Sequence, residues 1–132
     1  PERLYHRPEN PFVAEFIGKS TQFTGSIKST DPTILQNGAR TIHVNLAGAT
    51  KGTEHTAYVR PESIEITTKP DETMPNSFSG TVVHSEYLGN RTEMEVELSD
   101  GTVVDAVADA LPDVANGDRV TVQFEPSEVI VL

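Results

Sequence analysis

The chain has 132 residues, about the length of one domain, and its twenty acidic against ten basic residues give a formal net charge of −10. This balance weighs against binding to a nucleic-acid backbone or adsorption to anionic lipid, because both need a basic surface. No apolar stretch reaches the roughly 18 residues of a membrane span, and the lack of cysteine excludes disulfides and thiolate metal sites.

The first 18 residues follow a different pattern from the rest. Asn10 followed by Pro11 predicts a helix start, with asparagine as the cap and proline at the first helical position. Apolar residues at i, i+1, i+4 and i+5 then predict one buried face of a short helix over residues 12–17, which ends at Gly18. A helix this short is unstable alone. Because the chain also begins at Pro1, we expect it to be a piece of a longer protein.

From Gln22 the apolar period changes to two, which predicts β-strands. Residues 41–46 alternate with Ile42, Val44 and Leu46 on the buried side, and His43 is expected at the surface. Further strands are predicted over the following ranges: 55–60, 64–67, 78–84, 93–98, 102–107, 119–124 and 129–132. Turns are predicted around Gly101 and Gly117, where positive φ suits glycine.

The chain also repeats itself. Phe-Thr-Gly-Ser-Ile at residues 23–27 returns as Phe-Ser-Gly-Thr-Val at 78–82, and residues 52–64 match 117–129 at an offset of 65. Each copy alone would be marginally stable, because a domain of about 60 residues buries only about 60% of its unfolded surface. The short, turn-punctuated strands predict an all-β fold of tandem OB-like small barrels, preceded by the short helix.

The organisation that follows has two parts. Residues 1–18 form the end of a preceding domain, and residues 19–132 form a domain of two repeats. We place the repeats at 22–67 and 78–132, joined by a polar linker at 68–77 that holds two prolines.

Catalytic and metal motifs are weak. Gly18-Lys19-Ser20-Thr21 resembles the end of a phosphate-binding loop, but Val13 occupies the position of the earlier glycine. The four histidines are scattered, and no serine lies on a nucleophile turn. We therefore predict no catalytic residue, no metal site and no cofactor in this chain.

One acidic row allows two interpretations. Glu93, Glu95 and Glu97 share a face of one strand, which is typical of an edge strand protected against aggregation. The alternative is that this row forms a surface that attracts cations. The acidic composition of the whole chain does not decide between the two, because it is typical of an ordinary solvated surface.

Several stretches together resemble one family. Residues 2–18 are similar to the closing segment of the ATPase domain of bacterial and archaeal ABC importers, which ends in Phe-Val-Ala-x-Phe-Ile-Gly. Val-Arg-Pro-Glu at 59–62 resembles the signature of the domain that follows it, and residues 80–82, 86–89 and 117–120 resemble that domain's second half. The chain thus resembles, over essentially its whole length, the transport-associated OB (TOBE) domain of an importer's ATP-binding subunit.

This resemblance implies a regulatory and dimerisation domain without catalytic activity, because ATP and Mg²⁺ would bind the missing ATPase domain. The implied partners are a second copy, the importer's membrane subunits and a small-molecule cargo, with no nucleic acid. The implied location is the cytoplasmic face of the cell membrane. The motif variants look closest to polyamine or ferric-iron importers, although sugar and oxyanion importers have similar tails.

Five residues are candidate interface or ligand contacts. Arg60 and Glu62 flank Pro61, and this motif is interpreted either as a fold-stabilising corner or as part of an interface or pocket. Tyr87 is interpreted either as a core anchor or as a contact to the partner subunit. Its neighbours Glu86 and Arg91 complete the set.

A second function stays open. Paired OB-like barrels also suit a stand-alone protein that binds a small ligand such as an oxyanion. In that protein the helix over residues 12–17 would pack on its own barrel, whereas the end of an ATPase domain would be unsupported.

Overall fold

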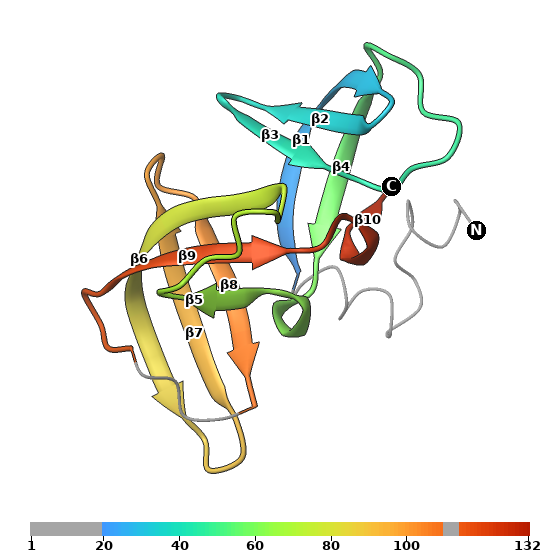
Figure 1. Cartoon of the computed structure of the whole chain (residues 1–132). Coiled ribbons are helices and arrows are strands. Elements are labelled where there is room, and N and C mark those ends of the chain that lie inside the picture. The colour runs from blue at the N-terminus through green and yellow to red at the C-terminus, as the bar shows by residue number, and fades with distance from the viewer. Residues whose placement is uncertain (1–19, 110–113) are drawn as a thin grey trace. The chain divides into compact units, whose positions relative to one another are not determined.

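The structure is a computed structural model that describes residues 20–109 and 114–132 (Figure 1). Its regular elements within these ranges are ten β-strands and two single-turn 3-10 helices, which confirms the all-β prediction. The helix predicted over residues 12–17 lies outside the described residues. In the part of the chain that is described, no helix has the length and apolar character needed to cross a membrane.

The chain divides into two compact units, each built on one five-stranded antiparallel sheet. Unit 1 comprises the chain up to Val59 together with Pro126–Leu132, and its strand order is β10-β4-β1-β2-β3. Its strands are β1 (Thr21–Thr30), β2 (Thr33–Asn37), β3 (Arg40–His43), β4 (Glu54–Val59) and β10 (Ile130–Val131).

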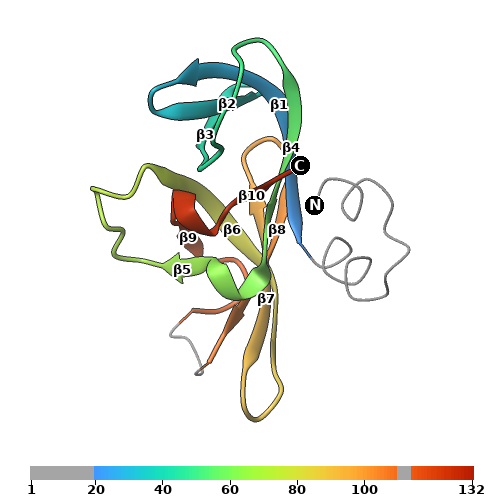
Figure 2. The ribbon, with the colours of Figure 1, turned by 90° about the vertical axis from the view of Figure 1, so that its right-hand side faces the viewer.

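Unit 2 comprises Arg60–Glu125, with the strand order β5-β9-β6-β7-β8. Its sheet curls, because the edge strands β5 and β8 contact each other and the 3-10 turn η1 (Pro61–Ser63) packs on β8. Figure 2 shows this curled sheet and its long β6–β7 hairpin from a second side. Its strands are β5 (Glu65–Thr67), β6 (Asn76–Tyr87), β7 (Thr92–Leu98), β8 (Val103–Ala108) and β9 (Arg119–Phe124).

The two repeats exchange their last strands. β5 ends the first repeat in sequence, yet it pairs with β9 of unit 2 through Ile66 opposite Val122. β10 ends the second repeat and pairs with β4 of unit 1 through Val131 opposite Ala57. Both pairs of residues are related by the 65-residue offset of the repeat, so the exchange is reciprocal and in the same register. A 3-10 turn precedes the exchanged strand in each copy, η1 before β5 and η2 (Pro126–Glu128) before β10.

The core of each unit follows the predicted alternation. On β7, Met94, Val96 and Leu98 are buried between glutamates, because successive side chains of a strand point to opposite faces. The predicted turn glycines are also confirmed, since Gly101 has φ 90° and Gly117 has φ 93°.

The strand predicted over residues 41–46 is too long. β3 ends at His43, which pairs with Ile34, and the Val44 amide donates a last hydrogen bond of 3.0 Å to the Thr33 carbonyl. Because β2 begins at Thr33, the strand has no partner residues beyond that point. His43 was expected at the surface, but it is half-buried, and Val44 belongs to the core.

Candidate functional site

The predicted contact loop is the tip of the β6–β7 hairpin. The Leu88 amide donates to the Arg91 carbonyl at 2.8 Å, which closes the turn, and Gly89 supplies the positive φ of 93°. The Tyr87 hydroxyl donates to the Gly89 carbonyl at 2.8 Å. Tyr87 nevertheless exposes 54% of its surface and Leu88 exposes 42%. The interpretation of Tyr87 as a core anchor is therefore wrong, because the hairpin carries the ring beyond the buried part of the sheet.

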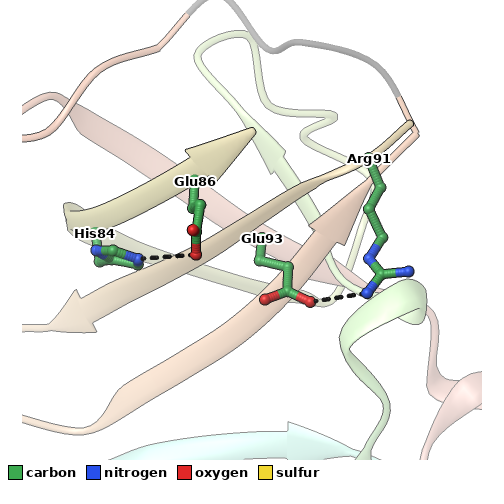
Figure 3. Close-up of polar contacts among 4 residues, drawn as sticks. All are labelled: His84, Glu86, Arg91 and Glu93. Atoms are coloured by element: carbon green, nitrogen blue, oxygen red, sulfur yellow. Dashed lines mark hydrogen bonds and ion pairs between the residues drawn. The ribbon is translucent and has the colours of Figure 1, made fainter. Parts of the chain in front are cut away.

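Two exposed polar pairs lie beside this tip (Figure 3). Arg91 Nη2 lies 3.3 Å from Glu93 Oε2, and His84 Nε2 lies 4.0 Å from Glu86 Oε1. About half or more of each side chain is exposed, so each pair contributes at most about 1 kcal/mol to stability. Glu86 and Arg91 are thus fixed only loosely and stay accessible to a partner.

The acidic row on β7 does not lie at a sheet edge. β7 is hydrogen-bonded to β6 on one side and to β8 on the other, so the edge-protection interpretation is wrong. Glu95 lies opposite His84 on β6 and opposite Asp105 on β8. The alternation of charged and apolar residues is the same for central and edge strands when one face meets solvent, which is why the sequence pattern did not separate them.

Asp105 is the most perturbed carboxyl of this face. Burial raises its pKa above the ordinary value, and the nearby Glu95 and Glu93 carboxylates raise it further. A pKa raised in this way means that the ionised carboxylate destabilises the fold at neutral pH.

The Arg60-Pro61-Glu62 motif forms a corner at the start of unit 2. Arg60 has extended backbone (φ −70°, ψ 147°), and its carbonyl accepts the Ser63 amide at 3.0 Å to form η1. Pro61 suits this turn because its own φ is restrained. The side chains of Arg60 and Glu62 are exposed. The backbone therefore has the corner geometry that one of the two interpretations predicts.

The structure brings three of the five candidate residues together. Glu86, Tyr87 and Arg91 share the β6–β7 hairpin, whereas Arg60 and Glu62 lie on the η1 corner. Sequence reasoning missed His84 and Asp105, because their proximity to the acidic row depends on the strand register. It also missed a β-bulge at Val83, where the register shifts by one residue between Val82 and His84.

Metal and nucleotide sites find no support in the described ranges. No group of three or more His, Asp or Glu side chains within residues 20–109 and 114–132 is placed to hold a metal ion. Thr21 begins β1, so a strand follows the Gly18-Lys19-Ser20-Thr21 stretch instead of the helix that a phosphate-binding loop needs.

The chain matches the model of the TOBE domain family over residues 57–132. Two relatives are ATP-binding proteins of importers. The spermidine/putrescine import ATP-binding protein PotA of Chromobacterium violaceum is 33% identical over 115 residues, covering 81% of this chain and 31% of the relative. The maltose/maltodextrin import ATP-binding protein MalK of Vibrio vulnificus is 35% identical over 132 residues, covering 92% and 34%. The chain thus spans about a third of these relatives.

A solved structure is similar in fold. The cytoplasmic molybdate-binding protein ModG superposes with a TM-score of 0.74, covering 83% of this chain and 93% of that protein. Its sequence is 16% identical, so the likeness concerns the fold alone. It confirms the OB-like architecture predicted from the short strands and turns.

Proposed function

The chain belongs to the TOBE domain family, and on this premise we propose that it is the regulatory and dimerisation domain of the ATP-binding subunit of an ABC importer. The observation that carries the proposal is the alignment of 81–92% of the chain with import ATP-binding proteins of two different transport systems. ATP and Mg²⁺ bind the ATPase domain of the parent subunit, and this domain contributes no catalytic residue. The subunit works at the cytoplasmic face of the membrane, against the importer's membrane subunits.

The proposed task is mechanical. A domain that keeps two ATPase halves paired must bias one arrangement over another, and a differential interaction of a few kcal/mol is sufficient. The hairpin tip suits a contact with the second copy, because Tyr87, Leu88 and Arg91 combine exposed aromatic, aliphatic and guanidinium groups. Tyrosine and arginine are enriched among the residues that dominate binding energy at protein interfaces.

The test is the oligomeric state of the chain. Analytical ultracentrifugation over a concentration series is expected to show a species of twice the 14.4 kDa monomer mass. Tyr87→Ala is expected to weaken the dimer at least about fivefold, because truncation of an interface aromatic costs more than about 1 kcal/mol. A strictly monomeric chain at every concentration would contradict dimerisation through this domain.

A matched variant separates interface contact from loop integrity. Tyr87→Phe removes the hydroxyl that donates to the Gly89 carbonyl but keeps the ring. If the ring makes the contact, the Phe variant dimerises like the wild type. Equal loss in both variants would mean that the turn, and not the ring, matters.

The cargo is the finer part of the proposal. We propose that the domain senses a small-molecule cargo. The chemical class of this cargo does not follow from the relatives, because one belongs to a polyamine importer and the other to a sugar importer. Thermal unfolding with polyamines, ferric chelates, sugars, molybdate, sulfate and phosphate tests this, since a ligand at 100 times its dissociation constant adds about 2.7 kcal/mol to stability. A shift with an oxyanion alone, together with a monomeric mass, would favour the alternative of a stand-alone oxyanion-binding protein. No shift with any compound would remove cargo sensing and leave the dimerisation role.

A further inference from the structure

The outer face of strands β6, β7 and β8 carries apolar residues that the fold leaves uncovered. Among the described residues, all four exposed large hydrophobic side chains lie on these strands or on the hairpin tip that joins β6 to β7. Val83 exposes 45% of its surface and Val103 exposes 43%. Val83 lies at the bulge of β6, and Val103 lies opposite Glu97 of β7, so the two valines flank the central strand near the same level of the sheet.

Carboxylates surround these valines. Glu95 and Glu97 are exposed on β7 between the two valine-bearing strands. Among the described residues, the carboxyl groups that the strand register places on this face are Glu86, Glu93, Glu95, Glu97 and Asp105. Within the described residues, the cationic groups on or beside this face are Arg91, which pairs with Glu93, His84 when protonated, and the exposed Arg119 of β9, which lies opposite Thr81 and so two strands away from Glu97. The face therefore combines exposed aliphatic side chains with more carboxyl groups than cationic groups.

Unit 1 shows that the fold does not require this surface. Its β1–β2 pair has a bulge at the same place in the repeat, between Ile27 and Ser29, so Lys28 corresponds to Val83. One residue past the bulge in unit 1, Ser29 of β1 lies opposite Ile34 of β2, which in turn lies opposite His43 of β3. The equivalent residues of unit 2 are His84, Glu95 and Asp105. Two residues before the bulge, Gln36 and Thr41 of unit 1 correspond to Glu97 and Val103 of unit 2.

The carboxylates on the outer face of unit 2 also destabilise its sheet. Carboxylates directly opposite each other in a sheet destabilise it, and Glu95 lies opposite Asp105. Burial and the charges of Glu95 and Glu93 both raise the pKa of Asp105, in agreement with this repulsion. The same sheet forms in unit 1 without these charges, so the sheet itself does not require the carboxylates of unit 2.

We propose that the outer face of β6–β7–β8 docks a basic protein segment in which lysine or arginine residues flank aliphatic side chains. The aliphatic side chains cover Val83 and Val103, and the cationic groups neutralise the row of carboxylates, which relieves the repulsion at Asp105. This contact differs from the dimer contact proposed above, which uses the hairpin tip at Tyr87 and Leu88.

Three probe peptides test the proposal by NMR titration of the isotopically labelled 132-residue chain. The probes are an alternating Lys/Val octapeptide, an alternating Lys/Ser octapeptide and an alternating Glu/Val octapeptide. The Lys/Val peptide is expected to shift the amide signals of β6, β7 and β8, with an affinity that falls as salt is added. The Lys/Ser peptide is expected to bind at least fivefold more weakly, and the Glu/Val peptide is expected not to bind.

Paired variants assign the binding to named residues. The double variant Val83→Thr and Val103→Thr is expected to bind the Lys/Val peptide about fivefold more weakly than the wild type. The double variant Glu95→Gln and Glu97→Gln is expected to bind it about tenfold more weakly at low salt. Glu54→Gln combined with Glu72→Gln removes the same charge from exposed positions outside these three strands and is expected to change the affinity less than twofold. Thermal unfolding of each variant checks that the fold is kept.

Three results would overturn the proposal. The first is amide shifts that lie outside β6, β7 and β8. The second is equal affinity for the Lys/Val and Lys/Ser peptides, because this would reveal a surface for any small polycation. The third is the absence of binding by the Lys/Val peptide at about 1 mM and low salt.

Discussion

At the scale of single residues, Asp105 is the position where charge and stability oppose each other. Its pKa is raised by burial and by the neighbouring Glu95 and Glu93, so its carboxylate form is less favourable in the folded chain than in the unfolded chain. Because the pKa of Asp105 is higher in the folded chain than in the unfolded chain, its contribution to stability is fully present at pH values below the unfolded pKa. This contribution is lost as the pH rises through the folded pKa. The loss therefore falls in a window that begins near the ordinary aspartate pKa and extends above it.

Asp105→Asn is expected to stabilise the chain at neutral pH. The gain in free energy of unfolding should be about 0.5 kcal/mol, the size typical of cross-strand pairs. The gain should vanish near pH 3, where the wild-type carboxyl is protonated in both states. Urea unfolding at pH 3 and pH 7 measures both values. Asp109→Asn, at an exposed position just after β8, serves as the control, and an equal gain at both pH values would contradict the electrostatic cause.

The two glycines that open the repeats are packing positions. A methyl group added at Gly25 would overlap the carbonyl oxygen of Gln36, and one added at Gly80 would lie 2.6 Å from Val96 Cγ1. Gly25→Ala is expected to lower the free energy of unfolding by about 1–3 kcal/mol through overpacking. Gly80→Ala is expected to cost less, because its closest contact is a side chain and the nearest backbone atom, the Glu97 carbonyl oxygen, lies at 2.9 Å instead of overlapping the methyl group. Chemical denaturation compares both with Ser79→Ala, and equal costs would contradict this ranking.

At the scale of elements, a buried glutamine holds the connection between β5 and β6. Gln123 on β9 is 2% exposed, and its amide nitrogen donates to the Asp71 carbonyl at 2.8 Å and to Ser77 Oγ at 3.0 Å. Its amide oxygen accepts the Asp71 backbone amide at 3.2 Å. One side chain thus satisfies both backbone groups of Asp71, as buried polar groups require.

Gln123→Met is expected to destabilise the connection between β5 and β6 locally while the sheet of unit 2 stays folded. The variant keeps the side-chain volume but removes the hydrogen bonds to the Asp71 backbone; because Asp71 is exposed and water can replace the partner, each lost bond costs about 0.5–1.5 kcal/mol. Hydrogen exchange should accelerate at Asp71 while Val122 and Val96, in the paired strands, remain protected. Thr73→Val is the control, because it removes an exposed hydrogen bond to the Asp71 side chain. Hydrogen exchange that accelerates uniformly across unit 2 would contradict this, because it would show that the hydrogen bonds of Gln123 support the whole sheet.

The sequence predicted the strands well and their neighbours poorly. Alternation placed the buried residues of β7 correctly because the period of a strand is fixed by its backbone. It did not identify β7 as a central strand, since pairing partners leave no mark on the period. Tyr87 was ambiguous because large aromatic residues are usually buried, and only the length of the hairpin carries it into solvent. The acidic cluster around Asp105 depends on register, which the sequence did not specify.

At the scale of the whole molecule, the exchange of last strands couples the end of the second repeat to unit 1. β5 and β10 are three and two residues long, so their own sequence carries too little pattern to choose a partner. The choice depends instead on the geometry of the 3-10 turn before each strand and on the exposed edges of β9 and β4. A repeat copied twice in one chain can close both sheets in this reciprocal way.

Removal of residues 126–132 is therefore expected to damage unit 1, although these residues follow the last strand of unit 2. The truncation exposes the β4 edge and deletes the buried Val129, and burial of a valine contributes about 1.5–3 kcal/mol. Hydrogen exchange should accelerate at Ala57 and Tyr58 of β4. The amides of Val96 and Val122 in unit 2 should keep their protection.

A point variant distinguishes strand loss from chain shortening. Val129→Asp retains the length but places a charge in the core of unit 1, so it should reproduce the pattern of the truncation. Ser127→Ala, at an exposed position of η2, should leave exchange unchanged. If either damaging variant exposed β5 and β9 first, the last strand would belong to the sheet of its own repeat. The reciprocal exchange predicts the opposite order, because the only strand that β10 pairs with in the described residues is β4.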